Sequence, residues 1–107
     1  MSSNCTDLSQ EVHDWWFNAD QVKAVIKSSG ERLVLPLSRQ NGSPPEKEIV
    51  FDNVSSIRIV DNQRIGWYDI NRFYVDNPQQ KAVIVGNIPI RIEIGSLYRL
   101  GITVSCL

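Results

Sequence analysis

Hydrophobic and polar residues alternate with a period of two over most of the chain after residue 20, which is the pattern of half-buried β-strands. The alternation predicts a first hairpin in which residues 22–27 pair with residues 32–37 around a turn at 28–31. A polar stretch rich in turn formers, residues 38–46, predicts a loop. Further strands are predicted at 48–51, 55–60, 65–68, 70–75, 81–85, 89–94 and 98–104.

The last four predicted strands constrain their own pairing, because a shift of one residue would turn every apolar side chain to the opposite face. A four-residue loop at 77–80 pairs Val75 with Ala82 and Phe73 with Ile84. Three-residue loops at 86–88 and 95–97 then pair Ile84 with Ile90, and Ile92 with Leu100. We therefore expect an antiparallel meander over residues 70–104.

The beginning of the chain follows a different period. Leu8, Val12, Trp15 and Trp16 are spaced i, i+4, i+7 and i+8, which places them on one face of a helix. Asp7 and Gln10 resemble a capping box at its start. These features predict one short amphipathic helix over residues 7–16 that docks on the rest of the fold.

Composition agrees with a mostly β fold: isoleucine and valine total 23 residues, against ten for alanine plus leucine. No strand–helix–strand alternation is present, which excludes a parallel α/β fold. We expect one domain, residues 1–107, with an N-terminal helical segment (1–20) and an antiparallel β body (21–107). Seven or eight strands fit either a small barrel or a two-layer sandwich, and the sequence does not decide between them.

Charge narrows the choice of partners. Eleven basic and twelve acidic residues give a formal net charge of −1, which disfavours nucleic-acid binding. Six basic residues nevertheless follow Val54, five of them arginine. They motivate an alternative function, a ligand- or lipid-head-group-binding barrel similar in size to pleckstrin-homology-like domains, which differ by ending in a helix. A membrane surface is thus the less favoured partner.

Residues that often perform chemistry are scarce. The chain has one histidine, His13, and two cysteines, Cys5 and Cys106, and residues 21–104 contain neither type. Zinc-site spacing, phosphate-binding glycine loops and nucleophile-elbow motifs are all missing from the sequence. We expect no enzymatic activity, no cofactor and no metal. With no signal-like start, we also expect a cytoplasmic protein with free thiols.

Aromatic residues carry the remaining hint. Trp15-Trp16-Phe17 and Trp67-Tyr68 hold five of the nine aromatic residues, and adjacent strand residues point to opposite faces. Tryptophan and tyrosine beside arginine are typical of binding hot spots, although burial in the core is an equally simple role. The sequence predicts a non-catalytic interaction module that binds another protein or a second copy of itself. Its predicted contact residues are Trp16, Phe17, Arg64, Trp67, Tyr68 and Arg72, with Trp16 and Tyr68 the first choices.

Overall fold

The computed structural model describes residues 5–23 and 31–107. The N-terminal segment contains β1 (Cys5–Asp7), α1 (Ser9–Val12), β2 (Trp16–Asn18) and α2 (Ala19–Lys23). The body contains β3 (Glu31–Ser38), β4 (Pro45–Val54), β5 (Ser56–Asp61), β6 (Trp67–Asp76), β7 (Lys81–Gly86), β8 (Ile90–Gly95) and β9 (Gly101–Cys106). Neither helix in this part of the chain is long and apolar enough to cross a membrane.

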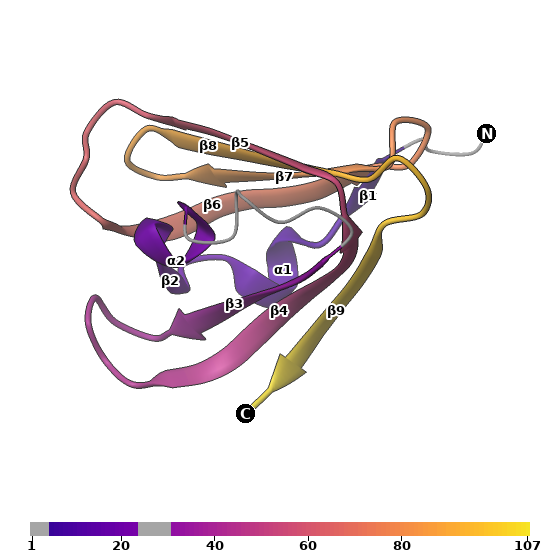
Figure 1. Ribbon diagram of the computed structural model, residues 1–107. Coiled ribbons are helices and arrows are strands. Elements are labelled where there is room, and N and C mark those ends of the chain that lie inside the picture. Colours follow the sequence, from indigo (N-terminus) through magenta and orange to yellow (C-terminus); the bar gives the residue numbers. More distant parts are fainter. Residues whose placement is uncertain (1–4, 24–30) are drawn as a thin grey trace.

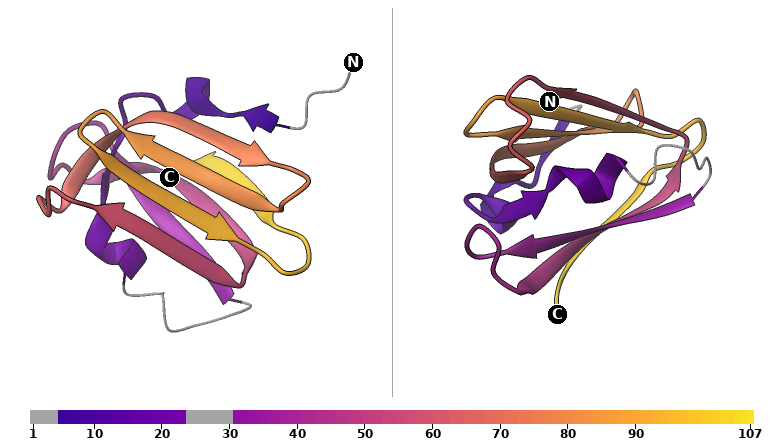
Figure 2. Two further views of the ribbon diagram at one scale, coloured as in Figure 1. Left: turned by 90° about the horizontal axis from the view of Figure 1, so that it is seen from above. Right: turned by 60° about the vertical axis from the view of Figure 1, so that its left-hand side comes forward.

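All strands belong to one antiparallel sheet that folds over on itself. Its order is β5-β8-β7-β6-β2-β3-β4-β9, and β1 pairs with β6 beside this path. We call β5, β8, β7 and β6 the upper layer, and β3, β4 and β9 the lower layer (Figure 1). β2 joins the layers because it pairs with both β6 and β3, and the two short helices lie between the layers (Figure 2). The predicted mostly antiparallel β class is therefore confirmed.

A sharp corner carries the chain from one layer to the other. β4 and β5 are separated only by Ser55, and together they run antiparallel to β9 and β8. Asn53 adopts φ +65° at this corner and donates from Nδ2 to the carbonyl of Arg99 at 2.9 Å. The Ser55 amide donates to the carbonyl of Gly95 at 2.8 Å. Strands that change layers at such bends are a common way to enclose a small core.

The core fills the space between the layers. Its members are apolar, alternate along their strands, and come from every layer and from the N-terminal segment. Phe51 and Phe73 meet edge to face across the layers, with ring centroids 6.0 Å apart. The largest fully buried side chains are Tyr68, Phe17, Phe51, Phe73, Leu33, Leu35, Leu37, Ile49, Ile70, Ile84, Ile92 and Ile94.

The predicted meander is confirmed for its first hairpin and displaced in its second. β6 and β7 pair Val75 with Ala82 and Phe73 with Ile84, as expected. β7 and β8 pair Ile84 with Ile92, whereas the sequence register placed it opposite Ile90. The two registers differ by two residues, so both keep the isoleucines on the buried face. Apolar patterning cannot distinguish them.

The predicted pairing of the last two strands is wrong. β8 pairs with β5 (Ile92 opposite Ile59), and β9 crosses the corner to pair with β4. The segment 96–100 that makes this crossing is held by Gln80, whose carbonyl accepts from the Ser96 amide at 3.0 Å. The side-chain oxygen Oε1 of Gln80 accepts from the Leu100 amide at 2.9 Å. These long-range bonds are invisible to a local hairpin argument.

The predicted helix over 7–16 is also wrong in extent. Only Ser9–Val12 is helical, because Asp14 adopts φ +66° and the chain continues into β2. The Asp7 carboxylate accepts from the Ser9 amide at 2.8 Å, but the N-cap of the helix is Leu8, without a side-chain cap bond, so the helix does not begin at the predicted capping box. In the predicted first hairpin, Val22 lies in α2 rather than in a strand, and residues 24–30 lie outside the described part of the chain.

Candidate functional site

The outward faces of the two layers differ in chemistry. On the upper layer, alternation places charged residues outward, and four of the six basic residues after Val54 lie there: Arg58, Arg72, Lys81 and Arg91. On the lower layer, the corresponding positions of β3 and β4 hold Val34, Pro36 and Val50, together with the charged residues Arg32, Glu48 and Asp52. A charged outer face is stable in water by itself, whereas an apolar one indicates a contact surface.

The lower layer's apolar positions form a continuous strip. Val34 lies directly opposite Val50, and Pro36 lies opposite Glu48. Val34 is 40% exposed, and Pro36 and Val50 are half-buried. Their buried neighbours Leu33, Leu35 and Leu37 confirm by alternation that the strip faces away from the core.

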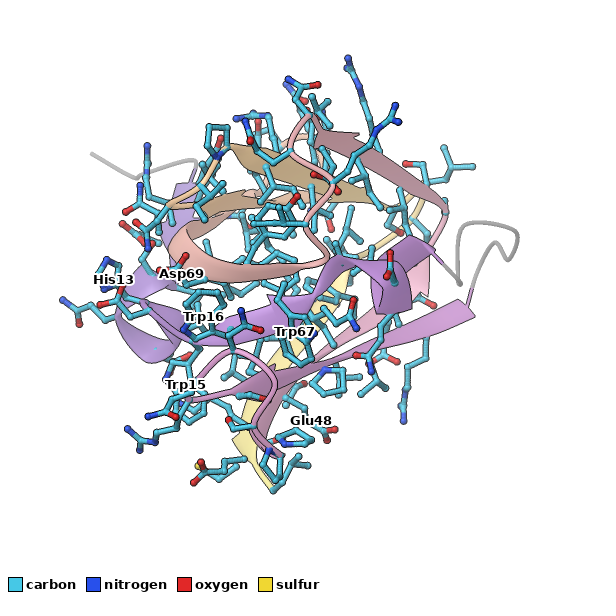
Figure 3. The ribbon with its side chains drawn as sticks, turned by 90° about the vertical axis from the view of Figure 1, so that its left-hand side faces the viewer. His13, Trp15, Trp16, Glu48, Trp67 and Asp69 are labelled. Atoms are coloured by element: carbon cyan, nitrogen blue, oxygen red, sulfur yellow. The ribbon has the colours of Figure 1, made fainter. Side chains whose placement is uncertain are left out.

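Two tryptophans extend this strip across β2 and β6. Phe17 and Tyr68 point inward, so Trp16 and Trp67 point outward, and both are half-buried. Trp16 lies opposite Asp69, which makes Trp67 its diagonal neighbour, within reach of an aromatic side chain. Figure 3 shows both rings on the same side of the molecule. We call this surface the apolar outer face; it consists of Trp16, Val34, Pro36, Val50 and Trp67.

Carboxylates border the apolar outer face. Glu48 lies opposite Pro36, and Asp69 lies opposite Trp16 (Figure 3). Asp69 accepts a hydrogen bond from the Asn87 side chain at 2.8 Å, which leaves its negative charge uncompensated. Arg32, the cation at the far end of β3, is already paired with Asp52 at 2.8 Å. Two carboxylates therefore adjoin the apolar outer face.

The structure separates the six predicted contact residues. Trp16 and Trp67 lie together on the apolar outer face, as described above. Phe17 and Tyr68 are fully buried, with ring centroids 6.1 Å apart, so the expectation that Tyr68 lies on the surface is wrong. Arg64 is exposed in the β5–β6 loop, where φ is +56°. Arg72 lies on the upper layer, with its guanidinium 5.0 Å from the Tyr74 ring centroid.

Tyr68 has a structural role that explains its burial. Its hydroxyl donates to Asp61 Oδ1 and accepts from the Ile65 amide at 3.3 Å. Burial, followed by the bond to the Asp61 carboxylate, raises the pKa of the Tyr68 hydroxyl above its usual value of 10.0. The Asp61 carboxylate also accepts from the Arg64 amide at 2.9 Å. Tyr68 thus fixes the loop that connects β5 to β6.

The charges of the upper layer are partly neutralised by Glu93. Its side chain, 13% exposed, lies 2.6 Å from Lys81 Nζ and 3.1 Å from Arg91 Nε. Hydrogen bonds from Lys81 and then Arg91 hold the pKa of the Glu93 carboxyl below its usual value of 4.5. Arg91 also donates to the Tyr74 hydroxyl at 3.3 Å. This network is the arrangement of a solvated β-sheet face.

Sequence reasoning missed a groove around Trp15. The Arg39 guanidinium and the Lys47 ammonium each lie 4.7 Å from the Trp15 ring centroid, and Lys47 Nζ donates to the carbonyl of Glu11 at 2.7 Å. Two open hollows of about 380 and 480 Å³ share Trp15, Arg39, Lys47 and Cys106 as lining residues. Glu11 lines the first hollow and Glu46 the second, so each hollow is lined by two basic side chains and one acidic side chain.

In the described part of the chain, the residues that could act as catalytic groups or metal ligands do not come together in one site. His13 Nδ1 lies 3.1 Å from Asp14, and both side chains are at least half exposed. Cys106 is an exposed free thiol on β9, on the rim of the Trp15 groove. Over residues 5–23 and 31–107, no three histidine, cysteine or acidic residues come together in a way that could hold a metal ion. The strongest candidate site is therefore a surface.

Comparisons with known proteins add no relatives: no family model, no curated protein and no solved structure matches this chain.

Proposed function

We propose that this chain is a non-catalytic protein-interaction module that binds another protein in the cytoplasm through its apolar outer face. The observation that carries the proposal is the grouping of two outward tryptophans with Val34, Pro36 and Val50 on the outward side of β2, β3, β4 and the start of β6. The outward side of the upper layer instead intersperses Val60 and Val85 among arginine, lysine and glutamate residues. A small protein that exposes such a strip gains stability when a partner covers it.

The chemistry of the surface limits the kind of partner. The centre is apolar, and the carboxylates of Glu48 and Asp69 lie beside it. The complementary partner is a protein surface with an apolar centre bordered by lysine or arginine. Trp16 and Trp67 are the expected energetic anchors, because tryptophan is enriched among the residues that contribute most to binding energy.

The test is quantitative capture from an extract of the cells that produce the protein. Val34→Lys places a charge in the strip, and Trp16→Ala removes an anchor. Arg58→Glu, on the outward side of the upper layer, is the matched control. We expect one set of captured proteins to fall at least about tenfold with the first two variants and to persist with the control. Circular dichroism verifies that all three remain folded. Equal capture by Val34→Lys and wild type would refute the proposal.

Anionic lipid head groups are a second candidate, supported by one observation. Arg58, Arg72, Lys81 and Arg91 share the outward face of the upper layer. Glu93 pairs with two of these cations, so the proposal depends on Arg58 and Arg72. Vesicles containing phosphatidylserine, compared with neutral vesicles at low salt, test this candidate in a sedimentation assay. Equal sedimentation with the two vesicle types would contradict it.

A further inference from the structure

The last strand of the sheet, β9, has an open edge. Among the described residues it pairs only with β4. The Leu107 amide donates to the carbonyl of Glu46 at 3.0 Å, so Leu107 and Glu46 form a hydrogen-bonded pair. Every second residue of β9, counted back from Leu107, is then also hydrogen-bonded to β4. Gly101, Thr103 and Ser105 therefore turn their backbone groups toward β4. Ile102, Val104 and Cys106 turn theirs toward the open edge.

This edge lacks the devices that protect edge strands. Natural proteins place charged residues, proline or bulges on such strands to prevent pairing with other chains. β9 has the sequence Gly-Ile-Thr-Val-Ser-Cys, with no charge and no proline, and its register with β4 is regular. β5, at the other end of the sheet, carries Arg58 and Asp61. Figure 1 shows β9 at the margin of the lower layer, with no other labelled element beyond it.

We propose that two copies of this chain associate by pairing their β9 strands antiparallel, with the two-fold axis at Val104. In this register Val104 lies opposite Val104 of the partner subunit, and Ile102 lies opposite Cys106 of the partner subunit. All three edge-facing residues then exchange both of their backbone hydrogen bonds. The lower layers of the two copies become one continuous sheet, and both apolar outer faces lie on the same side of it.

The lack of charge on β9 is what favours a second copy as the occupant. Across a two-fold axis, equivalent residues of the two chains approach each other, so a charged edge strand would repel itself. A strand from an unrelated protein would gain no electrostatic attraction from this neutral edge. Thr103 and Ser105, which point outward, lie opposite each other in the two copies and are compatible as a hydroxyl pair.

A pair of double variants tests both the interface and its register. In Thr103→Lys/Ser105→Lys, each lysine faces one lysine of the partner subunit, so two lysine–lysine contacts flank the axis. In Thr103→Lys/Ser105→Glu, each of these contacts becomes a lysine–glutamate pair. Both sets of side chains point away from the core, so folding is preserved. Sedimentation equilibrium of purified chain at low salt is expected to show at least tenfold weaker dimerisation for the lysine pair than for the charge-matched pair.

A second pair of variants tests the backbone bonds. Val104→Pro removes an amide that faces the open edge and leaves the bonds to β4 intact. Val104→Ala keeps that amide and controls for the lost packing of the side chain. We expect Val104→Ala to dimerise and Val104→Pro to be monomeric at the same concentration. If Val104→Pro fails to fold, the charge variants still decide the question.

Disulfide formation does not explain the expected dimer. In this register the two Cys106 residues lie four positions apart along the strands, roughly 13 Å, which is too far for a disulfide bond. The measurements are therefore made with reductant present. A wild-type chain that is monomeric at 100 μM, or two charge variants that dimerise equally, would overturn the proposal. These experiments use the purified chain alone, so their outcome is independent of the proposed partner binding.

Discussion

Val34 lies directly opposite Val50 in the β3–β4 ladder, and both side chains point away from the core. Their neighbours Leu33, Leu35, Ile49 and Phe51 point inward and are fully or almost fully buried. The same two strands thus bury an apolar face in the core and present Val34, Pro36 and Val50, beside charged residues, to solvent. The second face contributes little to the folding of an isolated chain, which leads to the first prediction.

Stability should depend strongly on the inward residues of β3 and weakly on the outward ones. Leu35→Ala removes a fully buried side chain and should lower the free energy of unfolding by about 2–5 kcal/mol. Val34→Thr, one residue earlier, should change it by no more than about 0.5 kcal/mol. Urea unfolding measures both. A loss at Val34 as large as that at Leu35 would contradict the assignment of the two faces.

The buried hydroxyl of Tyr68 gives a second prediction. Tyr68→Phe removes the donor to Asp61 Oδ1 and the acceptor of the Ile65 amide, while it keeps the ring in the core. Because one partner is charged, the free energy of unfolding should fall by about 2 kcal/mol. Tyr98, which is 83% exposed, provides the control Tyr98→Phe, and this change should be neutral. Equal effects of the two substitutions would show that Tyr68 does not stabilise the β5–β6 loop.

A third prediction concerns the pH dependence of stability at Glu93. Since Lys81 and Arg91 lower the pKa of its carboxyl in the folded state, the ionised form stabilises the protein above the usual pKa of 4.5. This stabilisation is lost as the pH falls through the lowered pKa. Glu93→Gln should therefore be less stable than wild type at pH 7, by about 1 kcal/mol or less. The difference should shrink as the pH falls below 4.5 and through the lowered pKa.

Thermal unfolding of both proteins between pH 7 and pH 3 measures this difference. Glu46→Gln is the matched control, because within the described part of the chain no ion pair involves the exposed Glu46 carboxylate. A Glu93→Gln difference that stays constant over this pH range would contradict the role assigned to the ion pairs.

The sequence predicted what local patterns determine. The β6–β7 hairpin formed in the expected register because its four-residue loop and its apolar face allow only one pairing. The β7–β8 register moved by two residues, a change that leaves every side chain on the same face. The geometry of the β7–β8 loop decides between the two registers, because apolar alternation is the same in both.

Long-range contacts explain the larger errors. The crossing of β9 to β4 depends on bonds from Ser96 and Leu100 to Gln80, which lies 16 or more positions away. The N-terminal helix stopped after one turn because β2 gains ladder bonds to β6 and β3 that a helix there would lose. Whether β9 pairs with β4 or β8, and whether residues 16–18 form a strand or a helix, depends on hydrogen bonds between segments far apart in the sequence.

The candidate surface was predicted only in part. For Trp67 and Tyr68, their adjacent positions on a strand correctly indicated that one of the two faces outward. The choice within this pair was wrong: Trp67 lies on the outer face, whereas Tyr68 turns inward and its hydroxyl donates to Asp61. Val34, Pro36 and Val50 carried no individual signal, because they become a surface only when β3 and β4 lie side by side.

The most direct measurement of the proposed function is photo-crosslinking from position 34. Benzophenone attached at position 34 of the apolar outer face is compared with the same group at position 58 on the opposite layer, in an extract of the producing cells. We expect one adduct of defined mass from position 34, lost when Trp16→Ala is added and not formed from position 58. Identical adducts from both positions, or none from position 34, would contradict the claim that the apolar outer face binds a partner protein.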